Sequence, residues 1–158
     1  MYQQNLFQEP KALLTPHAKF PGTDGQKMSK SYGNTISLRE EPDSVQKKIR
    51  SMPTDPARVR RTDPGSPELC PVWSLHQVYS EQKTQDWVTQ GCTSAGIGCI
   101  QCKQPVIDQI IMRQQPIITK VKELSADKAQ VQQMIASGNA TATAVAEQTL
   151  NKAKEVFS

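Results

Sequence analysis

The sequence predicts a mainly α-helical fold in which a loop-rich N-terminal stretch precedes a helical domain. In residues 1–36, prolines and glycines interrupt the chain so often that only short apolar pieces lie between them. From Leu38 onward, apolar residues recur at the spacing of a helix face. Because the first stretch is too broken to bury a sheet of its own, we expect it to be the end of a larger domain.

The composition excludes two classes of protein. The chain has 158 residues, 36% hydrophobic and 22% charged, with a mean hydropathy of -0.58, which is typical of a polar globular protein of one or two domains. No apolar run approaches the ~20 residues that a membrane span needs, and residues 1–10 lack the basic and then apolar pattern of a signal peptide. We therefore expect neither a membrane protein nor a small secreted one.

Apolar spacing and helix-ending residues locate the helices. Val45, Ile49 and Met52 share one helix face, and Pro53 ends that helix. Residues 53–70 hold four prolines and form a connector. Further helices are expected at residues 71–79, 84–90, about 104–124, 127–137 and 139–157, with a glycine- and cysteine-rich loop at residues 91–102.

Basic residues are concentrated in one part of a chain whose formal net charge is only +4. Between Lys47 and Arg61, six basic residues stand against a single acidic residue, Asp55. A local basic block indicates an anionic partner, with nucleic acid as the first candidate. A solvated helix face is the alternative interpretation.

Residues 21–36, PGTDGQKMSKSYGNTI, form what we call the lysine–serine loop. Its three glycines flank two lysines and two serines, so ammonium groups, hydroxyls and free backbone N–H groups are gathered in one loop. A polyphosphate requires these donors, and a positioned lysine stabilises the charge that develops as pyrophosphate leaves. A polar surface loop of no special function is the alternative.

Residues 27–31 read KMSKS, the signature of class I aminoacyl-tRNA synthetases, and they stand in a typical setting of glycines with an asparagine. Together with KKIRSMPTDP at residues 47–56 and CPVWSLHQVYS at residues 70–80, the sequence resembles the C-terminal portion of bacterial-type tryptophanyl-tRNA synthetases over essentially its whole length. The resemblance implies the end of a Rossmann-type α/β catalytic domain over residues 1–37. An all-helical anticodon-binding domain over residues 38–158 would follow.

The resemblance also implies an activity, that of an ATP-dependent ligase that activates tryptophan in the presence of Mg²⁺ and transfers it to tRNA(Trp). The other class I signature, His-Ile-Gly-His, does not occur in the sequence. We therefore expect the isolated chain to be inactive and most of the tryptophan pocket to lie outside it. The implied residues that bind ATP are Lys27, Met28, Ser29, Lys30 and Ser31; Lys27 and Lys30 are the catalytic candidates, with Lys30 stabilising the leaving pyrophosphate.

The partners implied by the family are tRNA(Trp), ATP and tryptophan, in a cytoplasmic enzyme that works as a homodimer. Arg58, Arg60 and Arg61 are the expected contacts to tRNA phosphates, because they belong to the basic block beside the helical domain. The alternative function is a non-catalytic, tRNA-binding helical module that carries a metal site.

Four cysteines, Cys70, Cys92, Cys99 and Cys102, follow the spacing C-x21-C-x6-C-x2-C. A cytosolic protein keeps its thiols reduced, which argues against disulfides. The last two cysteines can place thiolates on one metal centre, although four-cysteine zinc sites usually combine two such pairs. The spacing fits a [4Fe–4S] cluster, which some tryptophanyl-tRNA synthetases carry beside the anticodon-binding surface. Zn²⁺ and free buried thiols are the alternatives.

Overall fold

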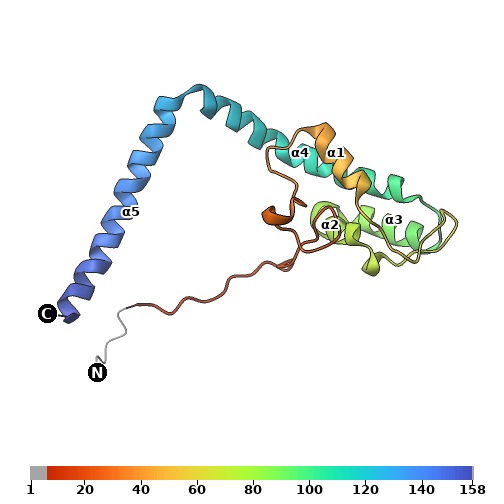
Figure 1. The fold of residues 1–158 in the computed structure, drawn as a ribbon, viewed down its shortest axis with the longest axis horizontal. Coiled ribbons are helices and arrows are strands. Elements are labelled where there is room, and N and C mark those ends of the chain that lie inside the picture. Colours follow the sequence, from red (N-terminus) through yellow and green to blue (C-terminus); the bar gives the residue numbers. More distant parts are fainter. Residues whose placement is uncertain (1–6, 158) are drawn as a thin grey trace. The chain divides into compact units, whose positions relative to one another are not determined.

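The computed structural model describes residues 7–157, and this part of the chain is helical, with five α-helices and no β-strand (Figure 1). The mainly α-helical prediction is therefore confirmed. None of the helices described is long and apolar enough to cross a membrane. In chain order the elements are the 3-10 helix η1 (Lys30–Tyr32), α1 (Pro42–Ser51), the 3-10 helix η2 (Pro67–Leu69), α2 (Pro71–Tyr79), α3 (Gln82–Thr93), α4 (Cys99–Ala126) and α5 (Lys128–Phe157).

The chain divides into two compact units. The larger is Leu14–Thr119, and the other combines the two ends of the chain, of which residues 7–13 and 120–157 are described. The lysine–serine loop and helices α1 to α3 all lie in the larger unit. The boundary that the sequence places between residues 37 and 38 does not separate these units, and it stays a prediction.

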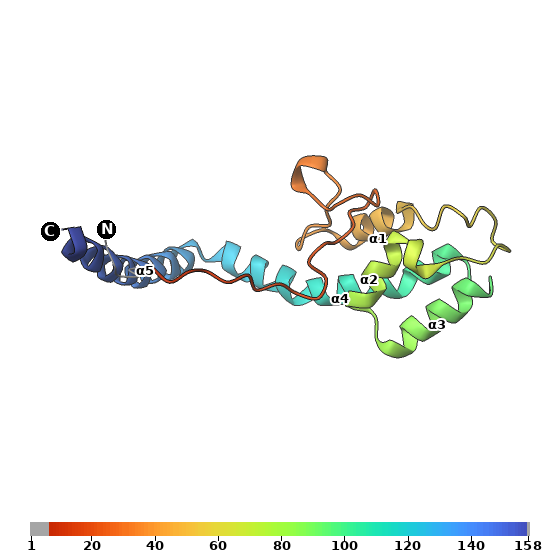
Figure 2. The same cartoon turned by 90° about the horizontal axis from the view of Figure 1, so that it is seen from below.

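Helices α1 and α2 and the first part of α4 build the core of the larger unit (Figures 1 and 2). Both α1 and α2 begin with a proline, at a position where the missing N–H has no partner to lose. Helix α2 has the bounds that its sequence predicts. The buried apolar side chains of this core are Val45, Ile49, Met52, Val72, Leu75, Val106, Ile107 and Ile110.

The loop predicted over residues 91–102 is wrong in its extent, because α3 continues to Thr93 and α4 begins at Cys99. Gly91 does not break α3; it lets the helix approach Ile97. A Cβ atom on Gly91 would lie only 2.8 Å from the Ile97 side chain. As a result, Cys99 and Cys102 lie in the first turn of a long helix rather than in a flexible loop.

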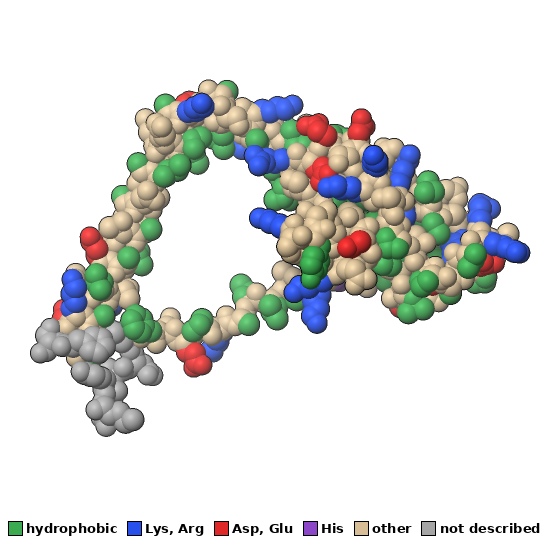
Figure 3. All heavy atoms as spheres, in the orientation of Figure 1, with side chains coloured by type: hydrophobic (Ala, Val, Ile, Leu, Met, Phe, Trp, Pro, Cys, Tyr) green, Lys and Arg blue, Asp and Glu red, His purple; other side chains and the backbone are tan. Residues whose placement is uncertain are grey.

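The two helices predicted at residues 127–137 and 139–157 are one helix, α5, which runs through Gly138. A glycine inside a helix costs about 1 kcal/mol relative to alanine, which is not enough to end a helix of this length. Asp127, which precedes α5, accepts a hydrogen bond from the Gln130 N–H at 2.9 Å, as an N-terminal cap does. Hydrophobic side chains lie exposed along α5 (Figure 3).

Candidate functional site

The lysine–serine loop is closed at its base. Pro21 and Lys27 form an isolated antiparallel bridge. Gly25 and Gly33 have φ angles of 79° and 66°, a region that glycine enters at little cost. These two glycines turn the chain before Lys27 and after η1. The loop therefore has a defined fold around the KMSKS residues.

A buried side chain, Asn34, holds the loop together from inside. It is only 2% exposed. Its Oδ1 accepts a hydrogen bond from the Ser29 N–H at 2.8 Å, and its Nδ2 donates to Asp24 Oδ1 at 2.8 Å and to the Lys27 carbonyl at 3.1 Å. A Cβ atom on Gly22 would lie 2.3 Å from the Asn34 amide, so only glycine leaves room for it. Asn34 thus fixes the backbone on both sides of Met28.

Asp24 contributes a carboxylate to the same arrangement. The hydrogen bond from the Asn34 amide, and then that from the Gln26 N–H, holds the pKa of Asp24 below its usual range. The carboxylate is therefore ionised at neutral pH and remains an acceptor for both donors.

The structure brings the expected ATP-binding residues together on one exposed turn. Lys27, Lys30 and Ser31 are exposed, and the Ser29 and Ser31 hydroxyls lie 2.8 Å apart. Among the described residues, neither lysine takes part in an ion pair. The two ammonium groups are thus available to an external anion. Met28 is half-buried and lines an apolar groove beside α2 and α4.

The four cysteines line one small cavity, of about 20 Å³, which we call the cysteine cavity. Cys70 immediately precedes α2, Cys92 lies in the last turn of α3, and Cys99 and Cys102 lie in the first turn of α4. Gly65 lies against the Cys92 side of the cysteine cavity, because a Cβ atom on Gly65 would lie 2.7 Å from Cys92 Sγ. Three helices that are separate in sequence therefore meet at these thiols.

In their present arrangement, no three or more His, Cys, Asp or Glu side chains among residues 7–157 are placed to hold a metal ion. Burial raises the pKa of the thiols of Cys70, Cys92 and Cys102, to about 12 for Cys102. The cavity thus offers the donor chemistry of a thiolate metal centre without its closed coordination geometry. A four-iron cluster would require the side chains to move, because the cavity is about the size of one water molecule.

His76 is fully buried beside Cys102. Its Nε2 lies 3.1 Å from the Cys102 carbonyl oxygen, which can only accept, so Nε2 carries the hydrogen. Nδ1 then accepts from the Ser80 hydroxyl at 2.8 Å. Burial lowers the pKa of His76 to about 4, so the ring is neutral at pH 7. Nε2 also lies 3.4 Å from Cys102 Sγ and helps to orient it.

The expectation that Arg58 contacts tRNA phosphates is not met, because the Arg58 side chain is buried. It is only 9% exposed. Its Nη2 donates to the carbonyl of Arg61 at 3.0 Å and to that of Ile97 at 2.6 Å, and its Nη1 lies 4.0 Å from Cys92 Sγ. The Arg58 guanidinium therefore belongs to the cysteine cavity, and the expectation of a phosphate contact is kept only for Arg60 and Arg61.

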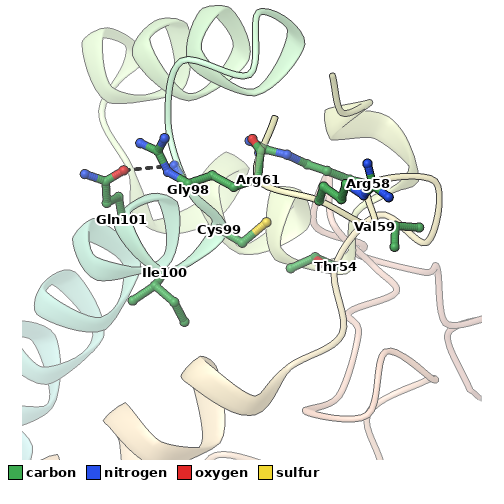
Figure 4. Close-up of a pocket in the computed structure, with 9 residues that line it drawn as sticks. Thr54, Arg58, Val59, Arg61, Gly98, Cys99, Ile100 and Gln101 are labelled. Atoms are coloured by element: carbon green, nitrogen blue, oxygen red, sulfur yellow. Dashed lines mark hydrogen bonds between the residues drawn. The ribbon is translucent and has the colours of Figure 1, made fainter. Parts of the chain in front are cut away.

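Arg60 and Arg61 remain exposed and border an open groove of about 530 Å³ at the start of α4 (Figure 4). The Arg61 side chain lies over Gly98, and a Cβ atom there would be 3.6 Å from Arg61 Nε. Gln101 Oε1 accepts from the Gly98 N–H at 2.9 Å. The groove thus combines exposed guanidinium groups with the positive end of a helix dipole.

Lys103 is a further residue of this site, and the sequence interpretation does not identify it. It is 3% exposed, and its Nζ donates to the carbonyls of Arg50 at 2.8 Å and Met52 at 2.6 Å, at the end of α1. A signal was present in the sequence, because residue 103 shares a helix face with Val106 and Ile110. A charged residue on an apolar face indicates a buried charge with a specific partner.

Comparison with known proteins identifies the class. A family model described as tRNA synthetases class I (W and Y) matches residues 1–151, and the chain belongs to this family. The curated relatives are tryptophan–tRNA ligases. The chain is 55% identical over 152 residues to that of Ralstonia nicotianae, covering 96% of this chain and 38% of the relative. It is 42% identical over 154 residues to that of Thermotoga maritima, covering 96% of this chain and 47% of the relative.

The structural comparison agrees. The tryptophanyl-tRNA synthetase of Campylobacter jejuni, complexed with ADP and tryptophane, matches with a TM-score of 0.77 and 25% sequence identity. The match covers 96% of this chain and 47% of that one. The chain spans less than half the length of these relatives. The predicted resemblance to tryptophanyl-tRNA synthetases is confirmed.

Proposed function

We propose that this chain is the C-terminal portion of a tryptophan–tRNA ligase and that its lysine–serine loop acts on ATP. In the first step the carboxylate of tryptophan attacks the α-phosphorus of ATP, with Mg²⁺ present; the bond to the bridging oxygen breaks and pyrophosphate leaves. In the second step the adenylate transfers tryptophan to a hydroxyl at the 3′ end of tRNA(Trp), and AMP leaves. The observation that carries this proposal is the closed KMSKS turn, whose two exposed lysines form no ion pair with any residue that the structure describes.

The loop residues have distinct roles in this proposal. Lys27, Met28, Ser29, Lys30 and Ser31 form the ATP-binding turn, in which the two ammonium groups and the serine hydroxyls hold phosphate oxygens. Lys30 stabilises the charge that grows on pyrophosphate as the bond breaks, with Lys27 assisting. Asn34 keeps the turn in shape through its hydrogen bonds to Ser29, Asp24 and Lys27.

The remainder of the chain would bind tRNA(Trp). Residues 38–158 are then the anticodon-binding domain, and residues 1–37 are the end of a Rossmann-type catalytic domain. Arg60 and Arg61 are proposed to contact tRNA phosphates, which is supported by their exposure beside the start of α4. Following the family, the complete enzyme would be a cytoplasmic homodimer.

The cysteine cavity is proposed as the site of a metal centre held by Cys70, Cys92, Cys99 and Cys102. The convergence of the four thiols supports it, and either a [4Fe–4S] cluster or Zn²⁺ matches this donor set. A bound centre would tie α2, α3 and α4 together and brace the adjacent groove. Anaerobically prepared protein with about four irons and four sulfides per chain indicates the cluster. Stoichiometric zinc in a colourless preparation indicates the alternative.

The function is tested with a chimera in which this chain replaces the matching segment of the Ralstonia ligase. We expect tryptophan-dependent exchange of pyrophosphate into ATP by the chimera. The isolated chain should give none, because His-Ile-Gly-His is absent from its sequence. A correctly folded chimera without exchange, combined with tRNA(Trp) binding by the chain, would favour the non-catalytic tRNA-binding module instead.

A further inference from the structure

Two buried cations, Arg58 and Lys103, lack the acidic partners that buried charges normally require. They are 9% and 3% exposed. Among the described residues, the only ion pairs join Lys48 to Glu40 and Lys120 to Glu123. Taking a charge out of water is strongly unfavourable unless an opposite charge compensates it. These two side chains therefore need an anion that the described part of the chain does not supply.

The Arg58 guanidinium is fixed with one edge at the thiol of Cys92. Its Nη1 lies 4.0 Å from Cys92 Sγ, while Nη2 is held by the carbonyls of Arg61 and Ile97. Its buried Nε has no hydrogen-bond partner. Carbonyl oxygens orient the group but do not neutralise its charge.

The Lys103 ammonium stands on another side of the same cavity. It donates to carbonyls of Arg50 and Met52 at the negative end of the α1 dipole. Its side chain lines the cysteine cavity together with Cys70, Cys99 and Cys102. The partial charge of a helix end offsets only part of an ammonium charge.

Asp55 also lines the cavity, but its carboxylate is bound elsewhere. Its oxygens accept from the N–H groups of Ala57 at 2.9 Å and Ser66 at 2.7 Å. With protonated thiols, the wall of the cavity would therefore hold two cations and one carboxylate, a net positive charge. Four thiolates around Zn²⁺, or around a [4Fe–4S]²⁺ cluster, carry a net charge of about −2 and reverse that imbalance.

We propose that Arg58 and Lys103 are charge-compensating residues for an anionic four-thiolate metal centre in the cysteine cavity. This inference rests on the proposed metal centre and adds residues outside its ligand set. It also explains why Arg58, although it belongs to the basic block, is turned away from the surface.

The test measures metal binding by the complete chain and by neutral variants. Reduced apoprotein is titrated with Co²⁺, followed by its thiolate absorption bands, and is reconstituted separately with iron and sulfide under anaerobic conditions. We expect Arg58→Gln and Lys103→Met each to weaken Co²⁺ binding by about 10- to 100-fold, the usual effect of losing a residue that supports a metal ligand. Arg58→Lys should retain most of the affinity, and Lys47→Met, an exposed lysine of α1, should not change it.

Thermal unfolding with and without metal separates this role from simple packing. If the cations compensate the centre, the neutral variants should lose most of the stabilisation that metal adds, in addition to the loss that their apoproteins show because hydrogen bonds to backbone carbonyls are removed. An equal loss of stability in apo and metal-bound protein would overturn the inference. So would unchanged Co²⁺ affinity and iron content in both neutral variants, although the metal centre itself would then stand. A wild-type chain that binds neither Co²⁺ nor iron and sulfide would overturn both proposals.

Discussion

Replacing Asn34 with alanine should open the lysine–serine loop while leaving the helical core intact. The Asn34 side chain makes three hydrogen bonds, to the Ser29 N–H, to Asp24 Oδ1 and to the Lys27 carbonyl. The residue is 2% exposed, so water cannot replace these bonds in the closed loop. The core of α1, α2 and α4 does not depend on them.

The expected size follows from the number of bonds. A net contribution of about 1 kcal/mol for each gives roughly 2–3 kcal/mol for opening the loop. Since 1.4 kcal/mol corresponds to a factor of ten, loop amides that exchange by local opening should exchange about 30- to 140-fold faster in Asn34→Ala.

Hydrogen exchange followed by mass spectrometry measures this directly. Peptides covering residues 21–36 should lose protection, and peptides from α2 and the first part of α4 should not. Gln26→Ala is the matched control, because Gln26 is exposed in the same loop and its hydrogen bonds to other described residues are made by its backbone. Unchanged protection of residues 21–36 in Asn34→Ala, or an equal loss across the core, would refute the role given to Asn34.

Two further predictions concern stability. Burial raises the pKa of Glu40, but hydrogen bonds, led by the one from Lys48, lower this pKa overall. The ionised Glu40 carboxylate therefore stabilises the fold above its unfolded pKa of 4.5, and this stabilisation is lost as the pH falls below that value. In urea unfolding at pH 7 and pH 3, Glu40→Gln should therefore lose less stability on acidification than wild type; an equal loss would contradict this. Leu75→Ala, at a side chain 1% exposed, should lower the free energy of unfolding by about 2–5 kcal/mol. Leu13→Ala, at a side chain 99% exposed, should leave it unchanged in the same urea titration.

Much of the fold could be predicted where the signal is local. Helix α2 has its predicted bounds because a proline at its start and apolar residues at helical spacing both lie within the helix itself. The predictions that Gly91 and Gly138 lie outside helices are wrong for different reasons. Gly91 is required by a close contact with Ile97, which the order of residues in the sequence does not reveal. At Gly138 an added Cβ atom would meet nothing within 4 Å, and a glycine there costs too little to end a helix.

The residues of the candidate site could likewise be predicted only where they are close together in the sequence. The KMSKS turn could be predicted because its residues are contiguous, and the structure brings them together on one exposed turn. The burial of Arg58 could not be predicted, because it depends on the Ile97 carbonyl and on Cys92, which lie 39 and 34 residues away in the chain. The convergence of the four cysteines likewise depends on the packing of α2, α3 and α4.

The central claim, that Lys30 stabilises pyrophosphate as it leaves, is tested most directly by the kinetics of Lys30→Ala in the Ralstonia chimera. We expect the maximal rate of tryptophan-dependent pyrophosphate exchange to fall by about 10²- to 10³-fold, roughly 3–4 kcal/mol, with little change in tryptophan binding. Lys19→Ala, an exposed lysine just before the loop, should keep the full rate. A Lys30→Ala chimera in which only the KM for ATP rises, at an unchanged maximal rate, would contradict the claim, because the lysine would then bind ATP before the reaction without assisting it.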